Sequence, residues 1–89
     1  MFYVYVIKSR KDNNMYIGYS RDLKRRISEH NNGQSKSTKH RTPFYLVYYE
    51  AYASQADAQQ REQRLKSSAG ARTALNRRIK GSVRLNHFV

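Results

Sequence analysis

Apolar and aromatic positions cluster in three short runs along the chain, at residues 2–8, 15–19 and 44–51. All three runs are rich in aromatic and aliphatic residues, with tyrosine in each, which predicts strands. The polar cluster at residues 11–14 separates the first two runs so closely that we expect an antiparallel hairpin. Gly18, inside the second run, indicates either a bulge or the close approach of another group.

Helical spacing begins after the hairpin. Leu23 and Ile27 stand one turn apart behind Ser20, a favourable N-cap, and they predict a helix over residues 21–30. Residues 33–43 are polar and basic, so we expect a mobile loop that does not pack.

A second helix is predicted over residues 55–68, because Ser54 opens a capping box. Its apolar stripe consists of Ala58, Glu62, Leu65 and Ala69. A carboxylate on such a stripe is costly to bury unless it is paired or binds a metal ion. Glu62 is therefore either half of an ion pair with one of the many arginines or a ligand for a hard divalent cation such as Mg²⁺.

Gly70 interrupts this pattern, and a third helix is expected from residue 71 to about Gly81. The order β-β-α-β-α-α predicts an α+β (α/β) fold, in which helices flank a three-stranded, mainly antiparallel sheet. A chain of 89 residues has room for one domain. We assign that domain to residues 1–82 and a C-terminal tail to residues 83–89.

Charge narrows the choice of partner. The chain has 18 Lys and Arg against 6 Asp and Glu, for a formal net charge of +12. Such an imbalance opposes compaction and favours a polyanionic partner, with nucleic acid ahead of an anionic membrane surface. The absence of cysteine excludes disulfides and thiol catalysis. The apolar N-terminal run is too short to span a membrane and lacks a signal peptide's basic start, so we expect a cytoplasmic protein with no membrane partner.

Few residues can be suggested as catalytic from their spacing in the sequence. Arg26 and His30 lie four residues apart, and therefore on one side of the first helix, but a general basic face explains that spacing at least as well as a catalytic pair. Tyr5 and Tyr16 lie on adjacent strands of the predicted hairpin, so their side chains could meet on one face. The three histidines show no metal-ligand spacing, which excludes a zinc site.

Five elements in order resemble the motifs of the GIY-YIG nuclease superfamily: Tyr3-Val4-Tyr5, Tyr16-Ile17-Gly18, Arg26, His30 and Glu62. More narrowly, the chain is similar to the small single-domain bacterial proteins related to the excision-repair excinucleases, the UPF0213 type. The resemblance extends over residues 2–80. Two positions depart from the wider family: Tyr3 replaces a glycine, and Tyr19 stands where excision-repair relatives carry a lysine.

The resemblance implies a metal-dependent endonuclease that hydrolyses phosphodiester bonds, with DNA as the expected substrate and DNA repair or recombination as its setting. Glu62 would hold one Mg²⁺ or Mn²⁺ ion, and Arg26 would neutralise charge on the phosphate. Tyr16 would accept the proton of the attacking water, and Tyr5 would position that water or Tyr16. His30 would receive the proton or hold the phosphate. A bacterial, nucleoid-associated location is implied as well.

The alternative is a nucleic-acid-binding module with weak or no cleavage. Both functions need basic residues that contact phosphate. The candidates are Lys24, Arg25, Lys36, Lys39, His40, Arg41, Arg72, Arg77 and Arg78. Only the nuclease requires a divalent metal ion and Glu62.

Overall fold

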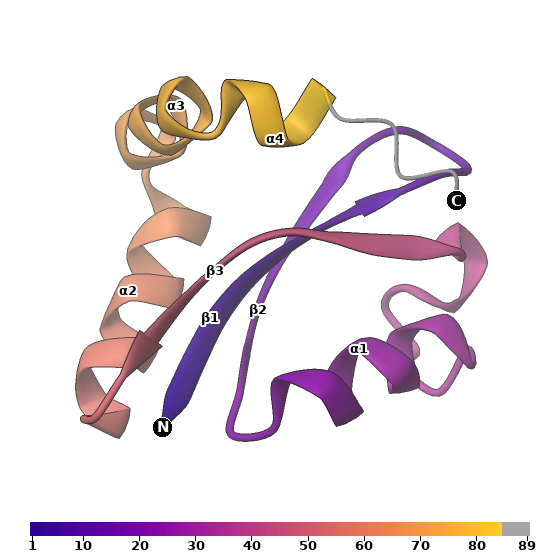
Figure 1. The fold of residues 1–89 in the computed structure, drawn as a ribbon, viewed down its shortest axis with the longest axis horizontal. Coiled ribbons are helices and arrows are strands. Elements are labelled where there is room, and N and C mark those ends of the chain that lie inside the picture. The colour runs from indigo at the N-terminus through magenta and orange to yellow at the C-terminus, as the bar shows by residue number, and fades with distance from the viewer. Residues whose placement is uncertain (85–89) are drawn as a thin grey trace.

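The structure, a computed structural model, describes residues 1–84. Its elements, in the order of Figure 1, are strands β1 (Phe2–Ser9) and β2 (Met15–Ser20), helix α1 (Leu23–Asn31), a short 3₁₀ helix (Lys39–Arg41), strand β3 (Phe44–Tyr52), and helices α2 (Gln55–Ser67), α3 (Ala69–Arg78) and α4 (Lys80–Arg84). The predicted order and the α+β class are confirmed, with α4 as an addition. Of the expected tail, residues 83 and 84 belong to α4, and residues 85–89 lie outside the described residues.

The central strand of the antiparallel sheet is β1, and the strand order is β2-β1-β3. The predicted hairpin pairs β1 with β2 and sets Tyr5 opposite Gly18 and Ile7 opposite Tyr16. On its other side, β1 pairs with β3 with a register shift between Val6 and Ile7. The irregularity of the sheet therefore lies in the pairing with β3, and the edge strand β2 pairs in regular register.

Helices cover both faces of the sheet, which forms the middle of three layers (Figure 1). On one face, Val4 and Val6 pack in a cluster with Leu65 of α2 and with apolar residues of α3 and α4. On the other face, Tyr5 and Ile7 pack against α1 and the start of β3. Because β1 is covered on both faces, all four of these residues on it are almost fully buried.

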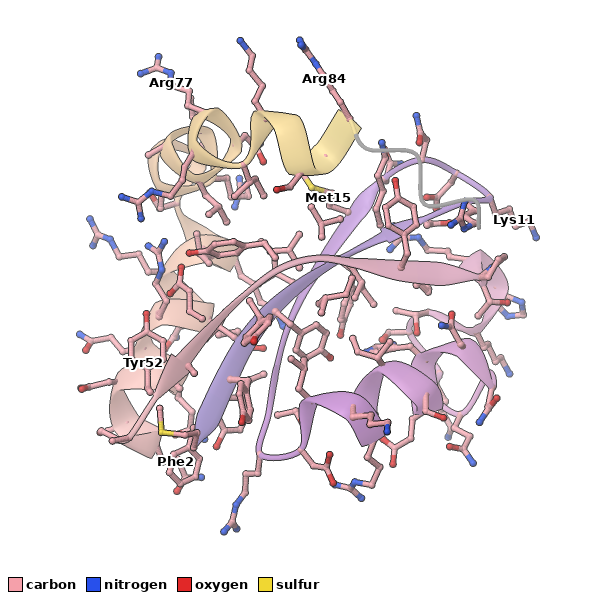
Figure 2. The ribbon with its side chains drawn as sticks, in the orientation of Figure 1. Phe2, Lys11, Met15, Tyr52, Arg77 and Arg84 are labelled. Atoms are coloured by element: carbon pink, nitrogen blue, oxygen red, sulfur yellow. The ribbon has the colours of Figure 1, made fainter. Side chains whose placement is uncertain are left out.

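The ends of the sheet are covered differently. Figure 2 shows Met15 beneath α4, whereas Phe2 and Tyr52 lie at the opposite end beside α2. These partly buried residues extend the apolar cluster under α2 and α4 along the length of the sheet. Among residues 1–84, no helix is both long and apolar enough to cross a membrane.

The start of α1 differs from the prediction. Its N-cap is Asp22 and not Ser20: the Asp22 carboxylate accepts a hydrogen bond from the Arg25 backbone N–H at 3.1 Å. Ser20 instead accepts from the Asp22 backbone N–H at 3.0 Å and shapes the turn before the helix. Aspartate is at least as good a cap as serine, and its negative charge is also favourable at a helix N-terminus.

The boundary between α2 and α3 also differs from the prediction. Ser68 and not Gly70 separates the two helices, because the Ser68 hydroxyl accepts from the Ala71 backbone N–H at 3.1 Å and caps α3. Gly70 is therefore inside α3. Ala69, expected on the stripe of α2, is the exposed first residue of α3.

The basic loop at residues 33–43 packs against the fold, so the prediction of a loop that does not pack is wrong. Ser35 and Thr38 are buried. Asn31, at the end of α1, holds the far end of the loop: its side chain accepts from the Phe44 backbone N–H at 2.6 Å and donates to the Phe44 carbonyl at 3.0 Å. The loop is held by hydrogen bonds of buried polar groups, which a search for apolar periodicity does not detect.

Candidate active site

Tyr5 lies across the edge strand directly over Gly18. A Cβ added to Gly18 would overlap the Tyr5 Cζ and Oη atoms and lie 2.9 Å from Cε1, so only glycine leaves room for the ring. The expectation that Gly18 marks a close approach is confirmed, and the approaching group is one of the candidate catalytic side chains. Tyr5 itself is 1% exposed.

His30, in the last turn of α1, is fully buried beneath the two tyrosines. Its Nε2 atom lies 2.8 Å from the Tyr5 hydroxyl, and its Nδ1 atom lies 2.7 Å from the Thr38 hydroxyl. The rings of Tyr5, Tyr16 and Phe44 surround it, with centroid distances of 5.8, 5.2 and 5.9 Å. With no exposed surface, His30 is out of reach of a phosphate group, which removes one of the two roles expected for it.

The same burial sets the protonation of this pair. Burial, together with the nearby Arg26 charge, lowers the pKa of His30 to about 4. Burial also raises the pKa of the Tyr5 phenol to about 12, although Arg26 opposes the rise through a hydrogen bond and its charge. Near neutral pH, His30 is therefore uncharged and Tyr5 keeps its proton.

Tyr16 is the more accessible of the two tyrosines. It lies opposite Ile7 in the hairpin, on the same face as Tyr5, and is only partly buried. Its ring meets the ring of His30 edge-on, whereas the hydrogen bond of the histidine goes to Tyr5. A proton from Tyr16 therefore has no direct hydrogen-bonded path to His30.

Arg26 projects from α1 one turn before His30, and its side chain is 31% exposed. The guanidinium donates to Glu29 at 3.0 Å and, through a longer bond of 3.4 Å, to the buried Ser35. Its positive charge also acts on Tyr5 and opposes the rise in the pKa of that phenol. Arg26 is therefore a positive charge that Glu29 and Ser35 hold at the boundary between the buried pair and solvent.

Glu62 is in the other helical layer, on α2, whose residues Ala58 and Leu65 pack on the opposite face of the sheet. Its side chain is 22% exposed and pairs with Lys66 at 3.0 Å. Lys66 in turn places its ammonium 5.7 Å from the centre of the Tyr16 ring. The negative charge of Glu62 also contributes to the raised pKa of Tyr5. Glu62 thus approaches the two tyrosines around the edge of the sheet.

The ion pair expected for Glu62 with an arginine occurs instead at Glu50 on β3. Arg61 donates two hydrogen bonds from Nε and one from NH2 to this carboxylate, at 3.0–3.1 Å, and the hydroxyls of Tyr48 and Tyr52 also donate to it. Although burial acts in the opposite direction, these donors hold the pKa of Glu50 below its usual value. Glu50 is therefore saturated with structural partners.

The donor set around Glu62 suits only certain metal ions. Among residues 1–84, no group of three or more His, Cys, Asp or Glu side chains is placed to hold a metal ion. Zinc in proteins takes three or four such ligands. Mg²⁺ is commonly held by one or two carboxylates, with waters and substrate phosphates as its other ligands. A lone, partly exposed carboxylate such as Glu62 fits the second pattern.

The basic residues expected to contact nucleic acid fall into two groups. Seven are exposed: Lys24, Arg25, Lys36, Lys39, His40, Arg77 and Arg78. Figure 2 shows Arg77 pointing outward from α3. Arg41 and Arg72 are instead engaged within the fold. Arg41 pairs with Asp12 at 2.5 Å, and Arg72 donates to the last carbonyls of α2 at 2.7 and 3.0 Å.

Sequence reasoning missed three side chains of the site: Ser35, Thr38 and Lys66. Ser35 and Thr38 lie in a polar loop with no periodicity that would mark them as buried. Lys66 follows Glu62 by one helical turn, a spacing that predicts an ion pair. Its approach to Tyr16 depends on where α2 crosses the edge of the sheet and is not encoded by local spacing.

The fold has the three-stranded sheet and flanking helices that the resemblance to a nuclease family implies. A family model described as the GIY-YIG catalytic domain matches residues 1–80. UPF0213 proteins of Staphylococcus saprophyticus and Staphylococcus aureus are 44% and 41% identical over 66 residues, which is 73% of this chain and 79% of each relative. The solution NMR structure of the UPF0213 protein BH0048 from Bacillus halodurans superimposes with a TM-score of 0.56 at 34% identity, covering 91% of this chain and 87% of that one. The chain belongs to the GIY-YIG family, as the resemblance implied.

Proposed function

We propose that this protein is a divalent-metal-dependent endonuclease that hydrolyses phosphodiester bonds in DNA. The observation that carries the proposal is the position of Tyr16 and Arg26. Both are accessible and both lie beside the buried Tyr5–His30 pair, while Glu62 lies in the other layer and its charge acts on Tyr5. The net charge of +12 supports a polyanionic substrate.

Each accessible group has a chemical task in this mechanism. Tyr16 would act as the general base in its phenolate form: its own proton leaves to solvent, which its partly exposed position allows, and the phenolate oxygen accepts the proton of the attacking water. Arg26 neutralises the charge that develops on the non-bridging phosphate oxygens, and it is held in place for this by Glu29 and Ser35. Tyr5, which keeps its proton, acts from beneath as a fixed hydrogen-bonding group.

Glu62 is the residue that would hold one Mg²⁺ or Mn²⁺ ion. When bound, such an ion polarises the scissile phosphate and stabilises the leaving oxygen. Lys66 shares the Glu62 carboxylate in the structure and keeps this negative charge balanced. As the resemblance to the excision-repair excinucleases implies, the proposal extends to DNA repair or recombination in the bacterial cytoplasm, at the nucleoid.

The test compares Glu62→Gln with Asp57→Asn, which removes the same charge from an exposed position in the first turn of α2. Both variants and the wild type are incubated with duplex, nicked, flapped and single-stranded DNA and with RNA, in Mg²⁺ or in EDTA. We expect wild type and Asp57→Asn to cut DNA only with Mg²⁺. Glu62→Gln should cut roughly 100-fold more slowly or worse, because the metal's contribution is lost.

Folding is controlled by thermal melts. Glu62→Gln removes only an i, i+4 ion pair with Lys66, which contributes about 0.3–0.5 kcal/mol, so the variant should fold. A folded Glu62→Gln protein that cuts at the wild-type rate would contradict the single-metal mechanism. If the wild type binds every substrate in the panel and cuts none, the protein is a nucleic-acid-binding module instead.

A further inference from the structure

Thr38 lies in the basic loop just before the 3₁₀ helix and has no role in the mechanism above. It is fully buried, and its hydroxyl contacts the Nδ1 atom of His30 at 2.7 Å. The other ring nitrogen contacts the Tyr5 hydroxyl at 2.8 Å. Thr38, His30 and Tyr5 thus form a continuous buried chain of hydrogen bonds from the loop to the central strand.

The direction of this chain follows from the donors and acceptors at its Tyr5 end. The Arg26 guanidinium acts on Tyr5, and a guanidinium can donate a hydrogen bond to the Tyr5 oxygen but cannot accept the Tyr5 proton. Among the described residues, His30 Nε2 is then the acceptor left for the buried Tyr5 proton. In uncharged His30 the ring proton must be on Nδ1, from which it points at the Thr38 oxygen. The Thr38 hydroxyl can rotate so that a lone pair of its oxygen accepts this proton.

We propose that Thr38 is a positioning residue that accepts the Nδ1 proton of His30 and so stabilises the tautomer in which Tyr5 donates to His30. With its own proton committed to Nε2, Tyr5 presents a lone pair to Arg26 and holds the guanidinium in place. The inference rests on the proposed nuclease function for its effect on cleavage, but not for the tautomer itself.

A second contact links the same loop turn to Arg26. Ser35 is buried and accepts from the Arg26 guanidinium at 3.4 Å, and the Ser35 carbonyl accepts from the Thr38 backbone N–H at 3.1 Å. The turn of residues 35–38 therefore supports Arg26 directly through Ser35 and indirectly through Thr38, His30 and Tyr5.

The test uses three variants. Thr38→Val keeps the shape of the side chain and removes its oxygen, Thr38→Ser restores the oxygen, and Thr73→Val makes the same change as the first at an exposed site on α3. The first readout is the tautomer of His30, from ¹⁵N chemical shifts of the ring nitrogens in each protein. We expect Nδ1–H in wild type, Thr38→Ser and Thr73→Val. In Thr38→Val we expect a shift toward Nε2–H, because a buried N–H without an acceptor is unfavourable.

The second readout is cleavage of the best DNA substrate in Mg²⁺. Thr38→Val should lower kcat about tenfold, as expected for the loss of one buried hydrogen bond, with little change in KM. Thr38→Ser should recover most of the rate, and Thr73→Val should leave it unchanged. Urea unfolding of each variant separates this effect from lost stability.

The proposal is overturned if wild-type His30 carries its proton on Nε2, or if Thr38→Val keeps both the Nδ1–H tautomer and the wild-type rate. A tautomer change without a loss of rate would overturn the catalytic role of Thr38. If the wild type cuts nothing, the nuclease proposal fails, while the ¹⁵N shifts still decide whether Thr38 sets the tautomer.

Discussion

Replacing Gly18 by alanine should displace Tyr5 and destabilise the whole domain. The added methyl would lie 2.9 Å from the Tyr5 Cε1 atom and overlap Cζ and Oη, whereas carbon atoms pack at about 3.5–4.0 Å. The ring would have to retreat by about 1 Å. It has no free space to do so, because Tyr5 is 1% exposed and lies between the edge strand and α1.

The magnitude follows from two effects. Overpacking a buried site of this kind typically costs about 1–3 kcal/mol. A shift of about 1 Å also disrupts the geometry of the 2.8 Å contact between Tyr5 and His30, which adds about 1 kcal/mol. We therefore expect Gly18→Ala to lower the free energy of unfolding by roughly 2–4 kcal/mol.

The assay is urea unfolding, followed by far-ultraviolet circular dichroism. Gly70→Ala is the matched control, because the nearest atom to its added methyl is 3.8 Å away and alanine is the better helix former inside α3. That control should be neutral or stabilising. Repeating Gly18→Ala in a Tyr5→Leu background isolates the clash, since the smaller side chain should remove most of its cost.

Two results would refute this reasoning. Gly18→Ala could leave stability within about 0.5 kcal/mol of wild type, the range of ordinary surface substitutions. Alternatively, it could destabilise the Tyr5→Leu protein as much as the wild type. In either case Tyr5 would not be the side chain for which Gly18 makes room.

Two further predictions concern pH and salt. Because burial keeps the pKa of His30 at about 4, below the unfolded value of about 6.5, the unfolded chain binds more protons between these values. The free energy of unfolding should therefore decrease by up to about 3 kcal/mol as pH falls through this window. Urea unfolding at several pH values checks this, and His30→Gln should remove that part of the slope. Affinity for DNA should fall steeply between about 50 and 200 mM salt as phosphate contacts release counterions, and an unchanged anisotropy titration would contradict this.

The strands and the outer limits of most helices could be predicted because their signals are local. The three apolar runs became the three strands, and the short polar link between the first two became the turn of a hairpin. The helix boundaries that were wrong involved competing caps within a few residues of one another. The first helix is capped by Asp22 and not by Ser20, and the break between the next two helices is at Ser68 and not at Gly70. Neighbouring polar residues can accept hydrogen bonds from the same backbone N–H groups, so the sequence alone does not choose between them.

The prediction for the basic loop was wrong for a different reason. Its sequence has the composition of an exposed segment, but two of its hydroxyl side chains are buried by partners on α1. Those partners are Arg26 and His30. They belong to a helix and not to the loop, so no regular spacing in the sequence links them to the two hydroxyls. A polar side chain is buried only where a specific partner lies at hydrogen-bonding distance. Its burial can therefore be recognised only when the positions of both partners are known.

The position of Glu62 shows why the edge strand matters to the candidate site. The sheet separates α1, which carries Arg26 and His30, from α2, which carries Glu62. Side chains from the two helical layers can approach each other only around an edge of the sheet. Of the two edge strands, β2 carries both Tyr16 and the glycine that lets Tyr5 extend toward its edge. Because Lys66 reaches the Tyr16 ring from α2, this route is short enough for a side chain to span. A further strand paired to β2 would close the route, so the narrow sheet is itself a requirement of the proposed chemistry.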